Sequence, residues 1–355
     1  MNHSLMSTYK RLPVTFARGE GALLWDTQDK EYLDALSGIA VCNLGHSHPA
    51  VTPALCDHAG RLVHTSNLYA IASQEALGDA LTELAGMDKV FFGNSGAEAN
   101  EAAIKLARLY ASKKGIKSPA IVVMDNSFHG RTLATLSATG SRKVQAGFEP
   151  LVQGFVRVPY GDMAALQAVA EHQPDVVAVM VEPIQGEGGI NVPPPDYLPG
   201  VRQLCDDRGW LMILDEIQTG MARTGMPFAY QHYDFKPDVM TVAKALGNGV
   251  PIGACLARDQ AAELFAPGNH GSTFGGNLLA CAAALTVCNT INEQRLWEAA
   301  ETIGTRIQGG LRSALTGVDG FVEVRGQGLM IGIQLDRPCA ELVTAALAQG
   351  LLINV

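Results

Sequence analysis

Two residues that follow apolar segments of the sequence, Asp215 and Lys244, are of types that can act on a bound cofactor. Asp215 ends the segment WLMILD, residues 210–215, and Lys244 follows DVMTVA, residues 238–243. A lysine among small residues at the end of a buried strand can have a lowered pKa and form a Schiff base with an aldehyde. Lys244 could also be a cation that reaches solvent, and Asp215 could be a helix cap or half of a salt bridge. Neither residue alone defines a site.

A third group of residues could bind a phosphate at the start of a helix. In GNSGAEANEAAIKLARLYASKKG, residues 93–115, Ser95 is followed three residues later by Glu98, which is the pattern of a capping box. The small residues Ser95, Gly96 and Ala97 would let the free N–H groups of the first helical turn approach a phosphate. Capping boxes are common, so the motif by itself also fits an ordinary well-capped helix.

Taken together, these groups match the needs of one cofactor, pyridoxal 5'-phosphate. A phosphate site, a carboxylate and a lysine on neighbouring strand ends would bind its phosphate, its pyridine nitrogen and its aldehyde. The carboxylate keeps the nitrogen protonated, and the protonated ring takes up the electron pair that remains when a C–H bond of the substrate breaks. The sequence therefore predicts an enzyme that uses this cofactor, with Lys244 and Asp215 as its catalytic residues.

The segment NSFHGRT, residues 126–132, could add to the same site. Phe128 can stack on a cofactor ring, and Arg131 could bind a substrate carboxylate through two hydrogen bonds. An arginine after a glycine is also common in surface ion pairs. His129 could act as an acid or base, or could simply pack and form hydrogen bonds.

The elements that would bring these groups together are short apolar segments that alternate with amphipathic helices between residues 55 and 278. A helix is expected over residues 197–208, after a run of three prolines. Four segments are predicted as buried strands because they are rich in Val, Ile, Leu or Met and end at a polar residue or Pro: residues 121–124, 176–181, 211–214 and 239–243. This order predicts an α/β fold with a mostly parallel sheet between helices, and ligands bind at the C-terminal ends of such strands.

The composition changes after residue 278, and we expect a smaller α+β domain there. An Ala-rich helix is followed by a charged helix over residues 293–315, by the strand-like residues 322–334 and by a helix from Pro338. The N-terminal piece reads as two short strands around the turn 27–30 and should pack with the small domain. The predicted domains are an N-terminal segment 1–53, a large cofactor-binding domain 54–278 and a small domain 279–355.

Composition argues against several other classes of protein. Of the 355 residues, 47% are hydrophobic and 17% charged, and the formal net charge is −9, which excludes a disordered or fibrous chain. Lys and Arg form no long runs, so no nucleic acid is expected as a partner. Neither an apolar run of about eighteen residues nor a signal peptide is found, so we expect a soluble cytoplasmic protein without a membrane partner. The seven cysteines lack a CxxC pair, and His46 and His48 lack acidic or thiol companions, so no metal site is expected.

The motifs, taken in their order along the chain, resemble those of the class III, or ω-amino-acid, aminotransferases. The resemblance covers essentially the whole chain and includes GEGALLWDTQDKEYLDALSGIAV, LGHSHP, the segments around Ser95, Asp215 and Lys244, VEPIQGEGG, HGSTFGGN and VRGQGLMIG. It implies the fold-type I architecture of pyridoxal-phosphate transferases, with a seven-stranded sheet. It also implies a homodimer whose active sites are shared between the subunits.

The resemblance further implies a role for individual residues. Lys244 would form the Schiff base, and Asp215 would pair with the pyridine nitrogen. The other cofactor-binding residues would be Gln218 at the phenolic oxygen, Ser95, Gly96 and Ala97 at the phosphate, Phe128 over the ring, and Thr273 at the phosphate of the other subunit. The substrate-binding residues would be Arg131 at the α-carboxylate, Ser272 close by, and Glu187, which resembles a glutamate that pairs with a second arginine.

The reaction expected from the resemblance is a ping-pong transfer of the ω-amino group of N-acetylornithine to 2-oxoglutarate. Its products would be N-acetylglutamate semialdehyde and glutamate, as in arginine synthesis. Other amine donors stay open, namely succinyl-diaminopimelate, succinylornithine, ornithine and 4-aminobutyrate. An aminomutase or decarboxylase is a further alternative, because cofactor-binding motifs do not decide which bond breaks.

The sequence departs from the family pattern after LLINV, residues 351–355. The family's second arginine lies in an Arg-x-x-Pro segment beyond such a strand, and no residue here matches it. Arg325 belongs to a different motif and does not replace it. We therefore expect the small domain to be incomplete, because a domain that ended after this strand would have an unpaired edge and exposed apolar surface.

Overall fold

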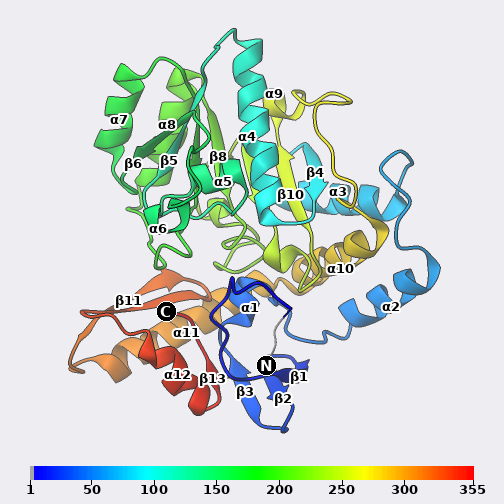
Figure 1. Cartoon of the computed structure of the whole chain (residues 1–355), viewed down its shortest axis with the longest axis vertical. Coiled ribbons are helices and arrows are strands. Elements are labelled where there is room, and N and C mark those ends of the chain that lie inside the picture. The colour runs from blue at the N-terminus through cyan, green and yellow to red at the C-terminus, as the bar shows by residue number, and fades with distance from the viewer. Residues whose placement is uncertain (1–3) are drawn as a thin grey trace.

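The computed structural model describes residues 4–355, and a large twisted sheet dominates its upper half (Figure 1). In the described part of the chain this sheet has seven strands in the order β4-β10-β9-β8-β7-β5-β6. The strands are β4 (Lys89–Gly93), β5 (Ala120–Met124), β6 (Phe155–Val158), β7 (Val176–Val181), β8 (Leu211–Asp215), β9 (Val239–Val242) and β10 (Gly253–Ala257). β10 is antiparallel to β4 and β9, while β9, β8, β7, β5 and β6 pair in parallel. The predicted α/β class with a mostly parallel sheet is confirmed.

Helices cover both faces of the large sheet, and the strand sequences explain why. In β8, Leu211 and Ile213 belong to the core under α4 (Gly96–Lys113). Met212 and Leu214 point to the opposite face, in the core that includes α7 (Met163–His172) and α8 (Tyr197–Arg208). Strands that are buried on both faces appear in the sequence as continuous apolar runs.

The bounds of these elements follow the prediction closely. β7 and α8 have the predicted bounds, and β5 and β8 differ from them by one residue. β9 ends one residue earlier than predicted, at Val242, because Lys244 already starts a short 3-10 turn, η2 (Lys244–Leu246).

The lower half of the molecule contains a sheet to which both ends of the chain contribute (Figure 1). Its order is β1 (Phe16–Glu20), β2 (Leu23–Asp26), β3 (Glu31–Asp34) and β13 (Leu351–Leu352), and β13 runs parallel to β3. The Nζ of Lys30 also donates to the carbonyl oxygen of Ala348 at 2.9 Å. A separate hairpin of β11 (Phe321–Gln327) and β12 (Met330–Leu335) lies beside the helices α11 (Leu296–Leu315) and α12 (Glu341–Ala348).

Two helices lie where the predicted domains would meet. α2 (Val51–Arg61) spans the predicted boundary at 53/54, and α10 (Leu278–Gln294) starts at the predicted boundary at 278/279. α10 packs along α2 and α3 (Ala72–Ala85), and its buried residues belong to the core of the large sheet. The helix that we grouped with the small domain therefore packs with the large one, and the division into domains stays a prediction.

Three local features differ from the prediction. β1 was not expected, because Phe16–Glu20 has few apolar residues and is mostly exposed. The segment 322–334 forms two strands rather than one, since Gly328 turns the chain with a φ of +54°. The helix expected from Pro338 begins at Glu341.

A left-handed turn, labelled α1 (Ser37–Ala40), leads from the small sheet toward the large one. Its four residues have φ angles of +56°, +63°, +65° and +58°. Such a conformation costs roughly 1–2 kcal/mol for each residue that has a Cβ atom. The carboxylate of Asp34 offsets part of this cost by accepting hydrogen bonds from the backbone N–H groups of Leu36 at 3.1 Å and Ser37 at 2.7 Å.

Replacing Ala40 by Gly should stabilise the protein, because glycine adopts a positive φ without the steric clash of a Cβ atom. We expect the free energy of unfolding to rise by about 0.5–1 kcal/mol, after allowance for the greater freedom of glycine in the unfolded chain. Urea unfolding of the purified variant measures this change. As a control, Ala299→Gly at an exposed position of α11 should lower stability by about 1 kcal/mol. Equal destabilisation by both substitutions would contradict the strain at Ala40.

Candidate active site

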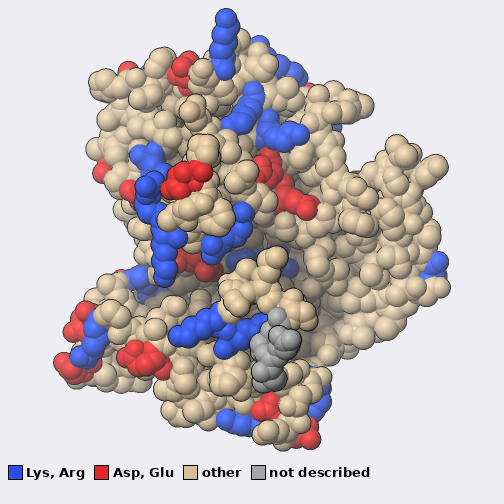
Figure 2. Space-filling model, viewed as in Figure 1, with Lys and Arg blue, Asp and Glu red and all other residues tan. Residues whose placement is uncertain are grey.

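A cavity of about 390 Å³ lies at the C-terminal ends of β8 and β9. The surface of the molecule is hollowed between its upper and lower halves, and basic and acidic side chains surround the hollow (Figure 2). The cavity is lined by nine of the residues predicted for the site: Ser95, Gly96, Ala97, Phe128, Arg131, Glu187, Asp215, Gln218 and Lys244. Segments far apart in the sequence thus meet in one place, while the individual roles of these residues stay predictions.

The first turn of α4 forms one side of the cavity. Ser95 caps the helix, and its Oγ accepts a hydrogen bond from the N–H of Glu98 at 3.2 Å. The carboxylate of Glu98 accepts from the backbone N–H of Asn94 at 2.6 Å rather than from that of Ser95, so the predicted capping box is shifted by one residue. A Cβ atom on Gly96 would lie 2.8 Å from the side chain of Ile217, so a larger residue would require Ile217 to shift. The N–H groups at this helix start have no partner within the helix and can bind an anion.

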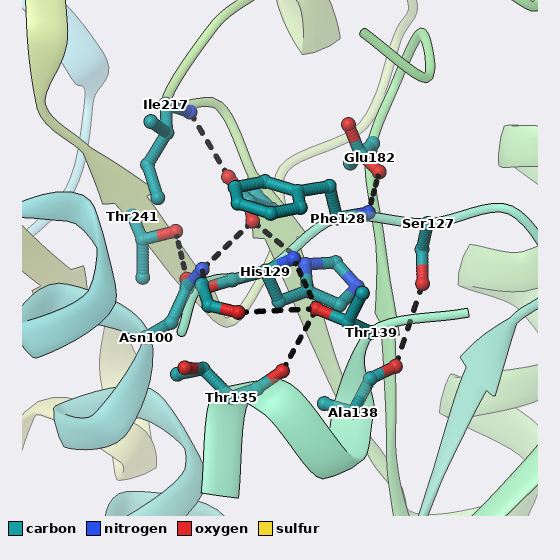
Figure 3. Close-up of polar contacts among 12 residues, drawn as sticks. Asn100, Ser127, Phe128, His129, Thr135, Ala138, Thr139, Glu182, Ile217 and Thr241 are labelled. Carbon is teal, nitrogen blue, oxygen red and sulfur yellow. Dashed lines mark hydrogen bonds and ion pairs between the residues drawn. The ribbon is translucent and has the colours of Figure 1, made fainter. Parts of the chain in front are cut away.

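Asp215 lies at the end of β8, and three donors surround its carboxylate. Oδ2 accepts hydrogen bonds from Nδ2 of Asn100 at 2.8 Å and from Nδ1 of His129 at 2.7 Å, while Oδ1 accepts from the N–H of Ile217 at 3.1 Å. Asp215 itself is 4% exposed. Donors of this kind stabilise the ionised carboxylate in a buried place. The three donor residues are seen in Figure 3.

Asn100 was missed by the sequence analysis, although it connects three parts of the site. Its Nδ2 also donates to the carbonyl oxygen of His129 at 2.8 Å, and its Oδ1 accepts from Oγ1 of Thr241 at 2.7 Å (Figure 3). The available signal was a polar residue on the Ala-rich, buried face of α4, where Ala99 and Ala103 flank it. A buried amide of this kind needs hydrogen-bond partners elsewhere in the fold.

His129 forms a hydrogen bond inside the protein, the second of the two uses considered for it. Its Nδ1 donates to Asp215, since an ionised carboxylate can only accept. Burial by itself lowers the pKa of His129, but the hydrogen bond and the charge of Asp215 raise it above its ordinary value. Within the described residues, its Nε2 has no hydrogen-bond partner. His129 thus stabilises the charge of Asp215 from below the cavity.

Lys244 lies near the end of the neighbouring strand, two residues beyond the last residue of β9. Its φ is +46°, a conformation that non-glycine residues seldom adopt and that is concentrated at functional sites. Burial lowers the pKa of its amine, and the charges of Glu187, Asp215 and Glu182 partly oppose this effect. A larger fraction of neutral amine is therefore present than for a lysine in water.

Glu182, which follows β7, is a second residue that the sequence analysis missed. Its Oε1 accepts from the N–H of Phe128 at 2.9 Å (Figure 3). Its Oε2 accepts from the N–H of Gly186 at 3.1 Å. Burial raises the pKa of Glu182 to about 7, with smaller effects from His129 and Asp215. This side chain holds the loop of Phe128 and the turn that contains Glu187 at the same cavity wall.

The predicted substrate side of the cavity contains Arg131, Glu187 and Gln218. The guanidinium carbon of Arg131 lies 5.5 Å from the ring centre of Phe128, and its side chain is exposed. Nε2 of Gln218 donates to Oε1 of Glu187 at 3.4 Å. This side of the cavity thus presents the guanidinium of Arg131 and the carboxylate of Glu187.

Ser272 and Thr273 do not line this cavity. Oγ of Ser272 accepts hydrogen bonds from Nδ2 of Asn94 at 3.1 Å and from the N–H of Gly275 at 3.0 Å, so it lies behind a lining residue. Thr273 is exposed on the surface. Its predicted contact with a phosphate would therefore be made outside the cavity of its own chain.

Two other observations concern metals and membranes. His46 donates through Nε2 to Oδ2 of Asp34 at 2.8 Å, and among residues 4–355 no three His, Cys, Asp or Glu side chains are grouped as metal ligands. Within the same residues, no helix has the length and apolar character needed to cross a membrane.

The groups around the cavity fit pyridoxal 5'-phosphate. The helix start at Gly96 suits its phosphate, the carboxylate of Asp215 suits its pyridine nitrogen, and the amine of Lys244 suits its aldehyde. Three hydrogen bonds fix the orientation of the Asp215 carboxylate at the end of β8.

Comparisons with known proteins agree with this chemistry. A model of the family Aminotransferase class-III matches residues 5–355. The acetylornithine aminotransferase of Nitrosomonas europaea is 58% identical over 355 residues, which cover 100% of this chain and 90% of that protein. The acetylornithine aminotransferase of Methanothermobacter thermautotrophicus is 48% identical over 351 residues, with coverage of 99% and 88%.

Solved structures are similar over the same length. The ornithine aminotransferase of Toxoplasma gondii ME49 has a TM-score of 0.95 at 37% identity and covers 98% of this chain and 84% of its own. The acetylornithine aminotransferase of Elizabethkingia anophelis has a TM-score of 0.87 at 37% identity, with coverage of 98% and 87%.

Replacing Asn100 by Ala should destabilise the protein, because Asp215 loses a donor and Thr241 loses its acceptor in a buried place. We expect the free energy of unfolding of the cofactor-free protein to fall by about 2–3 kcal/mol. Thr241→Val removes only the hydrogen bond from Thr241 to Asn100 and should lower the free energy of unfolding by about 1 kcal/mol. Chemical denaturation of both variants measures the difference. A cost for Asn100→Ala no larger than that for Thr241→Val would show that Asp215 does not depend on Asn100.

Proposed function

The chain belongs to the class III aminotransferases, and we propose that it transfers the ω-amino group of N-acetylornithine to 2-oxoglutarate. The observation that carries the proposal is the meeting of Lys244, Asp215 and the start of α4 at one cavity. The substrate is proposed because the acetylornithine aminotransferases reported above are similar to nearly the whole of this chain. Its place in arginine synthesis is proposed on the same ground.

The cofactor of this family is pyridoxal 5'-phosphate, and residues of this chain would hold each of its groups. Lys244 would hold the aldehyde and Asp215 the pyridine nitrogen. The other contacts would come from Gln218 at the phenolic oxygen, Phe128 over the ring, and Ser95, Gly96 and Ala97 at the phosphate. When bound, this cofactor supplies an aldehyde that accepts an amino group and a protonated ring that stabilises negative charge on the adjacent carbon.

Lys244 is the residue that would take a proton from the substrate. Because burial lowers its pKa, the Nζ of Lys244 can act as a neutral amine beside the substrate. This Nζ takes the proton from the substrate carbon that bears the amino group. Asp215 keeps its position throughout, because its three donors belong to the protein and do not depend on the substrate.

Arg131 and Glu187 provide charges that match the substrate. Arg131 would bind the α-carboxylate of N-acetylornithine through its guanidinium group. Glu187 lies in the same cavity and attracts the incoming ammonium group toward Lys244. The amino group passes to 2-oxoglutarate in the second half of the reaction, so the acceptor leaves as glutamate and the donor as N-acetylglutamate semialdehyde.

Ornithine is a second candidate for the amine donor. It is favoured by the close match with the ornithine aminotransferase structure of Toxoplasma gondii. Ornithine has a free α-amino group, whereas N-acetylornithine carries a neutral amide at that place. The two donors therefore differ in the charge that they bring beside the α-carboxylate.

We also propose that the protein acts as a homodimer in the cytoplasm. The surface near Thr273 supports a partner subunit, because Leu68, Tyr69 and Phe274 are 86%, 69% and 61% exposed. Nδ2 of Asn67 donates to the carbonyl oxygens of Ser272 and Gly275, so both exposed segments lie together. An apolar surface of this kind is typical of an interface. Thr273, at its edge, would reach the phosphate in the other subunit.

The proposed reaction can be followed by the visible absorbance of the holoenzyme. Adding N-acetylornithine without an oxo acid should lower the visible absorbance of the bound cofactor. Adding 2-oxoglutarate should then restore this absorbance. Lys244→Ala should lower turnover by at least about 1000-fold, because no other amine can move the proton. Lys236→Ala is the matched control, since the Nζ of Lys236 donates to the carbonyl oxygen of Gly86 at 3.0 Å and Lys236 does not line the cavity.

Other outcomes would change or refute the proposal. If the absorbance of the bound cofactor falls with ornithine and not with N-acetylornithine, the amine donor is ornithine. Product formation without any oxo acid would favour a mutase or decarboxylase. Normal turnover in Lys244→Ala would refute the role of Lys244.

Thr273→Ala tests the shared active site. We expect the Kd for pyridoxal phosphate to rise about 10-fold, because one hydrogen bond to a charged phosphate is lost. Titration of the cofactor-free protein gives this Kd, and light scattering gives the mass in solution. Thr305→Ala, at an exposed site on α11, should leave the Kd unchanged. A monomer whose Kd is insensitive to Thr273→Ala would contradict the proposed dimer.

A further inference from the structure

The turn that contains Glu187 is closed at its base and narrow at its tip. Gln185 and Asn191 form a bridge with two backbone hydrogen bonds of 3.1 Å each. The carbonyl oxygen of Gly186 accepts from the N–H groups of Gly189 at 3.0 Å and Ile190 at 3.2 Å. The turn is therefore a compact unit, and Glu187 moves with it.

The inner side of this turn is packed against the cavity wall. A Cβ atom on Gly186 would lie 2.1 Å from the side chain of Gln218, and one on Gly188 would lie 2.6 Å from the carbonyl oxygen of Asn126. The N–H of Gly186 is bound to Glu182. These contacts prevent the turn from moving further into the cavity.

The outer side of the turn is held by Arg325, from strand β11 of the small hairpin. Its Nε donates to the carbonyl oxygens of Gly189 at 3.1 Å and Ile190 at 3.0 Å, and one terminal nitrogen donates to Gly189 at 2.6 Å. The other terminal nitrogen donates to the carboxylate of Glu323 at 2.8 Å and to the side chain of Gln334. Because each nitrogen of the guanidinium already has an acceptor in the protein, Arg325 is not placed to bind a substrate carboxylate.

Hairpin β11–β12 also packs directly on the turn. A Cβ atom on Gly332 of β12 would lie 3.0 Å from Cβ of Ile190. Ile190 has a φ of +54°, so its backbone is held in a strained conformation at the point where Arg325 binds it. Without the guanidinium, the two carbonyl groups lose donors and the strained residue can relax.

We propose that Arg325 is a positioning residue: by holding Gly189 and Ile190 it keeps Glu187 facing Lys244, and this favours a cationic amine donor over a dicarboxylate in the cavity. The inference rests on the proposed transaminase function. Glu187 attracts the ammonium group of the donor and repels the additional carboxylate of 2-oxoglutarate. A displacement of Glu187 by about 2 Å changes these Coulomb energies enough to alter affinities several-fold.

Arg325→Lys and Arg325→Met in the holoenzyme test this role. Hydrogen exchange of the amides in residues 185–191 should become about 10-fold faster in Arg325→Met and less so in Arg325→Lys, which keeps one donor group. The KM for N-acetylornithine should rise about five-fold, while the KM for 2-oxoglutarate stays the same or falls. The Kd of the cofactor should change by less than two-fold, because Arg325 does not line the cavity.

Arg337→Lys is the matched control. Arg337 follows the same hairpin, but its guanidinium pairs with the exposed carboxylates of Asp319 and Asp336, far from the turn. We expect no change in exchange of residues 185–191 or in either KM for this variant. The control separates the loss of an arginine in this part of the fold from the loss of the contacts with the turn.

Several results would overturn the inference. Unchanged exchange in Arg325→Met would show that Arg325 does not hold the turn. An equal rise of the KM for both substrates would show that the position of Glu187 does not discriminate between them. If the wild-type protein has no transaminase activity, the proposed function fails, and the exchange measurement still decides whether Arg325 holds the turn.

Discussion

A buried negative charge at the end of β8 is the constraint on which the site depends. Asp215 is almost inaccessible to water, and removing a donor from a buried charge typically costs several kcal/mol. The fold therefore has to bring donors to it from elsewhere. Asn100 comes from α4, 115 residues earlier in the sequence, and His129 from a loop 86 residues earlier. The contacts that stabilise the charge also bring three separate segments together at the base of the cavity.

The walls of the cavity are held in place in a different way from its base. The base is made of buried side chains that hydrogen-bond to one another, whereas the walls are loops whose backbone is held by a few side chains. Glu182 holds the loop of Phe128 and the turn of Glu187 from inside, and Arg325 holds that turn from the small hairpin. Both kinds of support hold the groups around Lys244 in a defined geometry.

Local sequence patterns predicted the parts of this structure that depend on local forces. Buried strands such as β7 are continuous apolar runs, and the helix over residues 197–208 has clear boundaries, so both were placed well. Lys244 and Asp215 were found because a charged residue directly after such a run is unusual. Asn100 and Glu182 were missed, because their importance depends on partners that only the folded chain brings near. The same reason explains why α10 was assigned to the small domain. Its Ala-rich sequence predicts a helix but does not show against which core the helix packs.

The sheet that joins β3 with β13 sets an order of events when the chain is synthesised. Lys30 and its partner Ala348 are 318 residues apart, so at ribosomal rates the second residue appears roughly 15–60 s after the first. During that time the large sheet, whose strands lie between residues 89 and 257, has emerged and can fold. β3 meanwhile pairs with β2 on one edge, and its other edge lacks a neighbour. The catalytic half can therefore fold first, and β3 lacks its second neighbour until α12 and β13 have been synthesised.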